Sequence, residues 1–285
     1  MTNDLSQEAQ PRHIAVIVTT FNRPDALSAV LKGLRIQTDQ LFEVIVADDG
    51  SGDETRQAIE LERTKFPVKL SHIWHPDEGF RAAAIRNKGI LATEADYLIF
   101  LDGDCIPQPD FVARHRALAL GGRLITGSRI MLGKKFTAEL LDNEIDVFSI
   151  RAGKLLSERL RGEVNKVLPL WIKFPMGQWR HINRFVWRRI KSCNLSAWRK
   201  DILSVNGFDE SFVGWGHEDA DFVLRLFNAG IQRTDGAYAT EILHLWHPDA
   251  KRDSERGNYK TVQKRMETGQ IRALVGLDQR ISRAL

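Results

Sequence analysis

Two aspartates separated by a glycine could hold a divalent cation. Asp102 and Asp104 follow the apolar run 97–101, and Gly103 between them gives the chain room to turn. Both carboxylates can then face a Mn²⁺ or Mg²⁺ ion that also holds a diphosphate, because these ions accept oxygen ligands. Acidic residues after a strand are more often plain turn residues. The metal interpretation therefore depends on the groups that accompany this pair.

A histidine far along the chain could complete the ligands of such an ion. His244 lies in the run 241–248, after residues that resemble a strand, and His247 follows it closely. Neutral imidazole is a common metal ligand. A buried structural histidine is the usual alternative, and it would be preferred without Asp102 and Asp104. The sequence leaves open whether His247 shares the role of His244.

A second acidic turn could contact a nucleoside. Asp48 and Asp49 begin the run 48–53, Asp-Asp-Gly-Ser-Gly-Asp, which is also good turn chemistry. In the functional interpretation, one of the two carboxylates accepts hydrogen bonds from a base or ribose, and Arg23 and Arg81 contact phosphate or base. In the structural alternative, the aspartates only form the turn, and Arg81 lies on a solvated helix face.

The run 214–219, Gly-Trp-Gly-His-Glu-Asp, is the most unusual stretch of the sequence. Its two glycines would let the backbone approach a ligand, and Trp215 offers a platform for the apolar face of a sugar. Glu218, Asp219 and Asp221 follow. The helix dipole also favours acids in a first helical turn, so acids alone would be structural more often than catalytic. The glycines and the tryptophan favour a functional role.

Alternating strands and helices must position these groups. Apolar runs predict strands, and apolar residues at i, i+3, i+4 and i+7 predict the helices between them. We expect Asn22 and Asp53 to cap the first two helices. Such alternation is typical of an α/β fold with a mostly parallel sheet, which places Thr19, Asp49 and Asp102 at one rim, beyond the carboxyl ends of the strands. The predicted strands span residues 14–18, 44–47, 68–74 and 97–101, and the predicted helices include 27–34, 58–61 and 80–91.

The second half of the chain has a less regular pattern. Residues 123–190 carry weaker periodicity, and we expect strand edges, a mobile excursion and a helix there. A strand at 192–197, a short helix near 199–205 and a helix from Glu218 to Gly230 follow.

A basic and aromatic stretch lies at residues 171–191. It has no acidic residue, and aromatic side chains lie between the basic ones. This mixture suits contact with an anionic membrane surface or with an anionic acceptor. Binding of single-stranded nucleic acid and a plain packing helix are the alternatives. The basic residues are Lys173, Arg180, Arg184, Arg188, Arg189 and Lys191.

Composition narrows the class of protein. With 285 residues, 43% of them hydrophobic and 27% charged, the chain is not disordered, and its net charge of +4 favours an anionic partner. Its apolar runs are far shorter than the roughly 20 residues of a membrane-spanning helix. Cys105 and Cys193 lack the spacing of a zinc module or a disulfide scaffold. The N-terminus lacks the pattern of a secretion signal. We therefore expect a cytoplasmic protein, with peripheral contact to the inner face of the cytoplasmic membrane as a further expectation.

Several of these motifs resemble a known family. The first half is similar to the nucleotide-binding half of inverting family 2 glycosyltransferases, which have the GT-A fold, over roughly residues 12–130. The runs that carry this likeness are 16–23, 46–51 and 101–104. The second half is similar to the C-terminal region of β-1,4-galactosyltransferases and of bacterial chondroitin-type polymerases. The runs that carry this second likeness are 192–196, 206–208 and 214–219.

The resemblance implies a role for each site residue. It implies that Asp49 contacts uracil, and that Asp102 touches ribose or metal. Asp104 and His244 would ligate Mn²⁺, with Mg²⁺ as the alternative ion. Asp219 would be the general base, with Trp215 and Glu218 at the acceptor. The implied donor-binding residues are Thr19, Phe21, Arg23, Asp49, Arg81 and Asp102.

We therefore expect a metal-dependent inverting transfer of a hexose or N-acetylhexosamine from a UDP-sugar to a saccharide or lipid-linked saccharide acceptor. The product would be a bacterial lipopolysaccharide, capsule or similar glycan, and no nucleic-acid partner is expected. One alternative is a sugar nucleotidyltransferase, but the run 19–24 lacks its glycine-rich phosphate loop. The other is a catalytically silent glycan- or nucleic-acid-binding module. The expected division is a tail at 1–11, a nucleotide-sugar half at 12–130, a basic and aromatic excursion at 131–191, an acceptor and catalytic half at 192–250 and a helical tail at 251–285.

Overall fold

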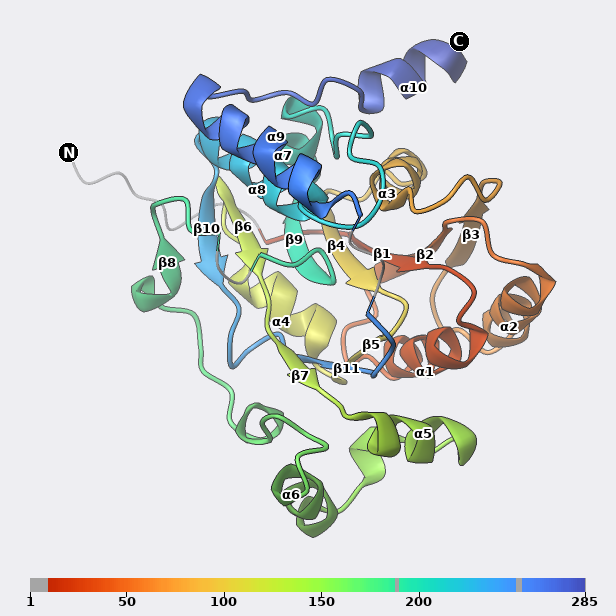
Figure 1. The fold of residues 1–285 in the computed structure, drawn as a ribbon. Helices are drawn as coiled ribbons and strands as arrows, with labels where there is room; N and C mark the ends of the chain where they lie inside the picture. Colours follow the sequence, from red (N-terminus) through yellow and green to blue (C-terminus); the bar gives the residue numbers. More distant parts are fainter. Residues whose placement is uncertain (1–9, 188–189, 250–252, 285) are drawn as a thin grey trace.

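The computed structural model describes residues 10–187, 190–249 and 253–284. In this part of the chain, an eight-stranded sheet runs through the centre, with helices on both faces (Figure 1). Its strands are β1 (Ile14–Thr20), β2 (Phe42–Asp48), β3 (Leu70–Trp74), β4 (Tyr97–Asp102), β6 (Arg123–Thr126), β8 (His181–Ile182), β9 (Asn194–Trp198) and β10 (Gln232–Asp235). They lie in the order β3-β2-β1-β4-β9-β6-β10-β8.

The four strands of the first half are parallel, which confirms the predicted α/β architecture. β1 pairs with β2 and β4, and β2 pairs with β3. The apolar residues of β1, β2 and β4 are at most 2% exposed, because both faces of the sheet are covered there, whereas β3 at the edge is only partly buried. The register aligns Thr19 with Asp102, and Thr20 with Asp48. The acidic turns that follow β2 and β4 therefore lie at the same rim of the sheet.

The second half of the chain joins the same sheet with changes of direction. β9 is antiparallel to β4 and β6, and β8 is antiparallel to β10. A smaller sheet combines β5 (Cys105–Pro107), β11 (Ile242–His244) and β7 (Arg129–Met131). In it His244 is paired with Cys105, and the N–H of Leu245 donates to the carbonyl of Asp104 at 2.9 Å. This small sheet brings His244 beside the acidic turn after β4.

Helices cover the two faces of the large sheet and form two apolar cores (Figure 1). Side chains of β1 alternate between these cores, as the two-residue period of a strand requires: Val16 and Val18 face one, and Ala15 and Ile17 face the other. The first core includes α1 (Pro24–Arg35), α2 (Asp53–Arg63), α4 (Phe111–Leu118) and α5 (Lys134–Asp142). The second includes α3 (Ala82–Leu91), α7 (Arg199–Ser204) and α8 (Glu218–Asn228).

The predicted helix caps at Asn22 and Asp53 are wrong. Arg23 precedes α1 without a side-chain cap, and Asp53 is the first residue of α2, which Gly52 precedes. Asn22 has a positive φ of 47°, and its side-chain carbonyl accepts a hydrogen bond from the N–H of Gly52 at 3.0 Å. Asn22 therefore ties the turn after β1 to the turn after β2, and this contact across the rim takes precedence over local capping.

A plain packing helix over residues 171–191 is also wrong. The described part of this stretch contains the short 3₁₀ turn at Gln178–Arg180 and the strand β8, and is otherwise irregular. Arg180 is fully buried, and it donates to the carbonyls of Phe174, Pro175, Asp235 and Ala237 at 2.7–2.9 Å. These bonds make Arg180 a structural residue. Arg188 and Arg189 lie outside the described residues.

Three further helices complete the described chain: α6 (Ala152–Leu160), α9 (Glu255–Thr268) and α10 (Leu277–Ala284). Helix α9 packs against α8 (Figure 1). None of the helices in residues 10–187, 190–249 and 253–284 combines the length and the apolar character that crossing a membrane requires.

Candidate active site

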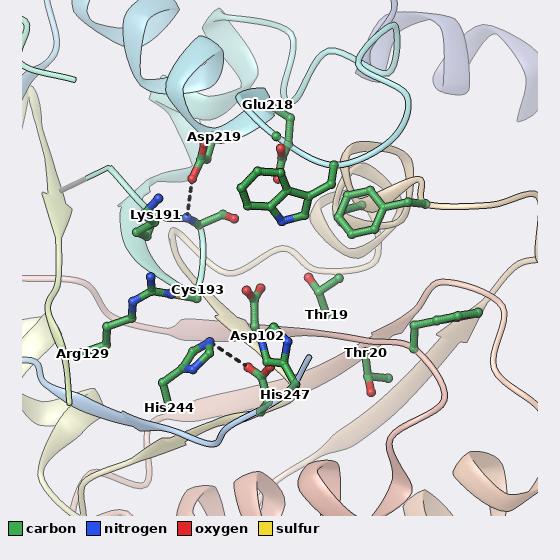
Figure 2. Close-up of a pocket in the computed structure, with 18 of the residues that line it drawn as sticks. Thr19, Thr20, Asp102, Arg129, Lys191, Cys193, Glu218, Asp219, His244 and His247 are labelled. Carbon is green, nitrogen blue, oxygen red and sulfur yellow. Dashed lines mark hydrogen bonds and ion pairs between the residues drawn. The ribbon is translucent and has the colours of Figure 1, made fainter. Parts of the chain in front are cut away.

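The predicted site residues meet at a cavity of about 810 Å³ at the rim of the large sheet (Figure 2). The carboxyl ends of β1 and β4 form one side of it, and the start of α8 forms the opposite side. Arg81 does not line this cavity. The predicted residues that do line it are Thr19, Phe21, Arg23, Asp49, Asp102, Asp104, Trp215, Glu218, Asp219 and His244.

Arg81 contributes its backbone to the site rather than its guanidinium. Its side chain forms an ion pair with Glu78, whereas its N–H donates to Asp49 Oδ2 at 2.9 Å. Asp49 Oδ1 lies 2.6 Å from His75 Nε2. Burial raises the pKa of Asp49, and the hydrogen bonds from Arg81 and His75 act against this rise. Two fixed partners thus hold the Asp49 carboxylate in the cavity wall.

The structure distinguishes the two aspartates of the turn after β2. Asp48 is 1% exposed, accepts a hydrogen bond from the N–H of Ser51 at 2.8 Å and lies 3.0 Å from His72 Nε2. Asp48 therefore stabilises the turn, as the structural alternative predicted for this motif. Asp49, in contrast, lines the cavity.

Asp104, His244 and His247 form a candidate metal centre. Each offers one ligand atom, and the three atoms lie within 4.8 Å of one another. Asp104 Oδ2 is 3.3 Å from His247 Nε2, and Asp104 Oδ1 is 3.8 Å from His244 Nε2. His247 Nδ1 donates to the carbonyl of Pro248 at 2.8 Å, which leaves Nε2, the nitrogen that faces Asp104, as the ring atom that can reach a cation. Asp102 is not one of these three residues.

This set of ligands fits a first-row divalent cation. Two imidazoles and one carboxylate suit Mn²⁺ better than Mg²⁺, which prefers oxygen ligands alone. Burial lowers the pKa of His244, with the charge of Asp104 acting in the opposite direction. The imidazole is therefore in the neutral form that binds a metal.

Arg86 links the two sides of the cavity, and the sequence analysis missed it. This guanidinium is buried, with Nη2 3.1 Å from Asp102 Oδ1, Nη1 3.1 Å from Glu218 Oε1 and Nε 3.2 Å from Thr19 Oγ1. A signal was present in the sequence, because Arg86 directly follows the apolar run 82–85, Ala-Ala-Ala-Ile, which predicts a helix packed against the sheet. An arginine inside such a helix must be buried and paired with acids.

Arg86 also acts on the acidity of Asp102. Burial raises the pKa of Asp102 to about 6, and the charge of Arg86 opposes this rise while that of Asp104 adds to it. The carboxylates of Asp102 and Glu218 share one cation, so their positions are coupled through Arg86.

Asp219 differs from its neighbours in the first turn of α8. Its Oδ1 accepts a hydrogen bond from the N–H of Ala220 at 2.7 Å, and its Oδ2 accepts one from the N–H of Ser192 at 3.3 Å (Figure 2). Burial raises the pKa of Asp219 to about 6, and the charge of Glu218 adds to this rise while Lys191 acts against it. This half-buried carboxylate has the pKa of a general base that works near neutral pH.

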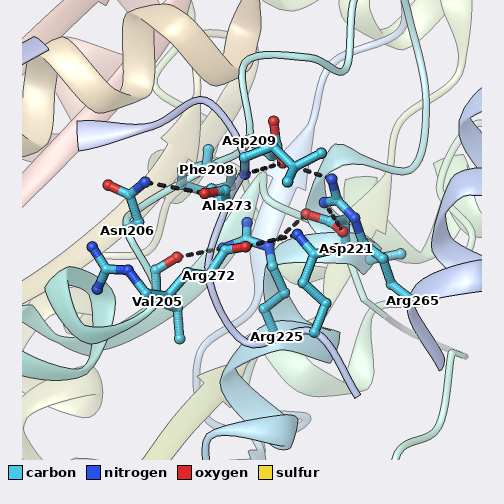
Figure 3. A network of polar contacts seen from close by, with 12 residues as sticks. Val205, Asn206, Phe208, Asp209, Asp221, Arg225, Arg265, Arg272 and Ala273 are labelled. Carbon is cyan, nitrogen blue, oxygen red and sulfur yellow. Dashed lines mark hydrogen bonds and ion pairs between the residues drawn. The ribbon is translucent and has the colours of Figure 1, made fainter. Parts of the chain in front are cut away.

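Asp221, the third acid of this turn, is structural. It is fully buried and forms ion pairs with Arg225 at 2.8 Å and with Arg265 of α9 at 2.5 Å (Figure 3). It does not line the cavity.

The fold is shared with glycosyltransferases of known structure. TarS 1–349 of S. aureus in complex with UDP superposes with a TM-score of 0.58 at 15% identity, covering 94% of this chain and 68% of the other. Glucosyl-3-phosphoglycerate synthase of Mycobacterium tuberculosis, in complex with Mn²⁺, UDP and glucosyl-3-phosphoglycerate, gives a TM-score of 0.53 at 19% identity, with coverages of 91% and 80%. The chain therefore has the GT-A fold.

The sequence matches the family described as Glycosyl transferase family 2 over residues 15–186, and the N-terminal domain of galactosyltransferase over residues 181–248. The chain belongs to glycosyl transferase family 2. The two matches overlap at residues 181–186, within the basic and aromatic stretch 171–191.

Curated relatives are longer than this chain. Hyaluronan synthase of Pasteurella multocida is 29% identical over 271 residues, which cover 90% of this chain and 27% of the relative. Validoxylamine A glucosyltransferase of Streptomyces hygroscopicus subsp. jinggangensis is 29% identical over 229 residues, with coverages of 78% and 53%. Chondroitin synthase of Escherichia coli is 26% identical over 264 residues, with coverages of 87% and 37%. The chain thus spans about a quarter to a half of the length of these relatives.

Proposed function

We propose that the chain catalyses the metal-dependent, inverting transfer of a hexose or N-acetylhexosamine from a UDP-sugar to a saccharide acceptor. The acceptor belongs to a bacterial surface glycan such as lipopolysaccharide or capsule. One observation carries the proposal: the Asp104, His244 and His247 cluster and the Asp219 carboxylate face one cavity from opposite sides. The names of the curated relatives, which include two polysaccharide synthases, support a saccharide acceptor.

The donor nucleotide lies along the rim formed by β1 and β2. Asp49 accepts a hydrogen bond from the base through a lone pair that His75 and Arg81 leave available, since a carboxylate has about four acceptor positions. Phe21, which is 45% exposed, covers the nucleoside. Two solved neighbours, TarS 1–349 and glucosyl-3-phosphoglycerate synthase, are in complex with UDP, which supports a uridine nucleotide.

The diphosphate lies over Asp104, His244 and His247. These three residues would hold Mn²⁺, and the bound ion would supply positive charge against the diphosphate of the leaving UDP. Asp102 is held toward this end of the cavity by Arg86.

Asp219 removes the proton from the attacking hydroxyl of the acceptor. The acceptor oxygen then forms a bond to the anomeric carbon while the bond from that carbon to the β-phosphate oxygen breaks, and the electron pair leaves with UDP. This single displacement inverts the anomeric centre, because attack and departure take place on opposite faces. Glu218, held by Arg86, binds sugar hydroxyls, and Trp215 packs against the apolar face of the acceptor ring.

A donor panel tests the proposal. Purified protein is incubated with Mn²⁺, one UDP-hexose or UDP-N-acetylhexosamine at a time, and saccharide acceptors, and UDP release is measured. We expect release from at least one donor, with acceptor-dependent stimulation and an inverted glycosidic product by NMR. Absence of UDP release from every donor, or a product with retained configuration, would contradict the proposal.

A further inference from the structure

The glycine-rich loop before α8 packs against the first turn of α9. Gly214 has a φ of +78°, and a Cβ there would lie 2.4 Å from Ser254 Oγ. Gly216 has a φ of +111°, and its carbonyl accepts a hydrogen bond from Asn258 Nδ2 at 2.9 Å. Gly214 therefore allows the close approach of α9, not only of a ligand as the sequence suggested. Helix α9 becomes part of the cavity wall.

Buried charges fix α9 to α8, the helix that carries Glu218 and Asp219. Arg265 of α9 forms ion pairs with Asp221 at 2.5 Å and with Asp209 at 2.7 Å, and all three side chains are buried (Figure 3). Arg225 of α8 pairs with Asp221 from the other side at 2.8 Å. Breaking such a buried network is costly, so α9 and α8 hold a defined relative position.

Three rings meet where α9 reaches the cavity. Trp187, His217 and Tyr259 form a cluster with ring centroids 5.3–5.5 Å apart. Trp187 and His217 line the cavity, and Tyr259 is 42% exposed. His217 directly precedes Glu218 and Asp219. The ring cluster therefore lies next to the carboxylates of the acceptor side.

The charges around these rings indicate what occupies the space. Glu255 lies beside Gly216, and Glu218 and Asp219 of α8 follow His217, while Arg86 pairs with Glu218 and Lys191 acts on Asp219. Carboxylates accept hydrogen bonds from the hydroxyl groups of a sugar. A pyranose ring has an apolar C–H face for stacking on aromatic rings and hydroxyls at its edge.

We propose that Trp187, His217 and Tyr259 form a subsite for the second sugar ring of the acceptor, the ring next to the one that is glycosylated. The acceptor is therefore an oligosaccharide rather than a monosaccharide. This inference rests on the proposed function and deepens it. It also gives a role to α9, which lies outside the motifs found in the sequence, and to Trp187, which belongs to the basic and aromatic stretch 171–191.

Acceptor length tests the subsite. UDP release is measured with N-acetylglucosamine, glucose, and the di- and tetrasaccharides of chitin, cellulose, chondroitin and hyaluronan as acceptors. For the saccharide series that gives the fastest UDP release, we expect kcat/KM to be at least tenfold higher for the disaccharide than for its monosaccharide. Tyr259→Ala should raise the KM for the disaccharide at least fivefold and leave kcat and the KM for the donor within twofold. Tyr259→Phe keeps the ring and should behave like the parent.

Met266→Ala is the matched control, since this α9 residue is 49% exposed and takes no part in the ring cluster. Equal use of mono- and disaccharides, or no change in Tyr259→Ala, would overturn the subsite while the transferase activity stands. Saturation-transfer NMR with the tetrasaccharides provides a readout that needs no turnover. Tyr259-dependent binding without UDP release would support the subsite and contradict the proposed function. Binding of no tetrasaccharide to the protein with UDP and Mn²⁺ would overturn the subsite.

Discussion

The adjacent carboxylates of Glu218 and Asp219 have different partners, and this difference supports the roles that we propose for them. Glu218 forms an ion pair with the buried guanidinium of Arg86, which compensates the negative charge of the carboxylate. Among the contacts described, the hydrogen bonds of Asp219 come from the backbone N–H groups of Ser192 and Ala220. The pKa of the Asp219 carboxyl is raised. Successive helix residues also point about 100° apart, so one can face the reacting hydroxyl while the other binds sugar. These contacts support the proposal that Asp219 is the base.

Conversion of each carboxylate to its amide separates the two roles. Asp219→Asn should lower kcat by about 10²- to 10⁴-fold, the usual contribution of general-base catalysis, with UDP and Mn²⁺ binding nearly unchanged. Glu218→Gln should weaken sugar binding and have a smaller effect on turnover. Turnover is measured at saturating donor and acceptor, and UDP binding by calorimetry. Turnover of Asp219→Asn within threefold of the parent would show that the base is another group.

The raised pKa of Asp219 predicts the acid limb of the pH profile. Only the ionised carboxylate accepts a proton, and with a pKa of about 6 its ionised fraction falls about tenfold per pH unit below that value. We expect kcat at saturating Mn²⁺ to be level above pH 7 and to fall with unit slope below pH 6. The residual activity of Asp219→Asn should lack this limb. A parent profile that stays flat down to pH 5 would exclude Asp219 as the titrating base.

At the scale of elements, the link between α8 and α9 should be a main source of stability. Arg265→Ala leaves Asp209 and Asp221 buried without their shared cation, which should lower the free energy of unfolding by about 3–5 kcal/mol. Arg56→Ala is the control, because its pair with Asp53 is largely exposed and should contribute less than about 1 kcal/mol. Urea unfolding measures both. Equal small losses in the two variants would mean that the network does not anchor α9.

The sequence predicted those elements whose pattern is local. The parallel strands of the first half and the helices between them follow from apolar periodicity, and the acidic turns follow from the strand ends. Long-range contacts had no such signal. Asn22 binds the N–H of Gly52 instead of capping α1, and His247 joins Asp104 through the small sheet. The irregular stretch 171–191 is held by Arg180 and four backbone carbonyls, which no periodicity reveals.

At the scale of the whole molecule, exposed aromatic side chains support the prediction that the protein contacts a membrane loosely. Trp171, Phe174 and Trp179 are 43–61% exposed, but Arg180 is buried and adds no surface charge. With about 1 kcal/mol for each basic residue near an anionic surface, binding should be weak and sensitive to salt. Flotation with anionic liposomes should recover part of the protein at low salt and none at high salt. If all of the protein stays in the soluble fraction at low salt, the prediction of membrane contact is wrong.

Metal dependence of UDP-sugar turnover tests the central claim most directly. The diphosphate of the donor would be repelled by Asp102 and Asp104 unless a cation lies between them. UDP release from the best donor is measured after EDTA treatment and again after addition of Mn²⁺, with Asp104→Ala beside the parent. We predict that EDTA abolishes turnover, that Mn²⁺ restores it better than Mg²⁺, and that Asp104→Ala loses donor affinity while its unfolding free energy changes little. Full turnover in EDTA, with Asp104→Ala as active as the parent, would contradict the account.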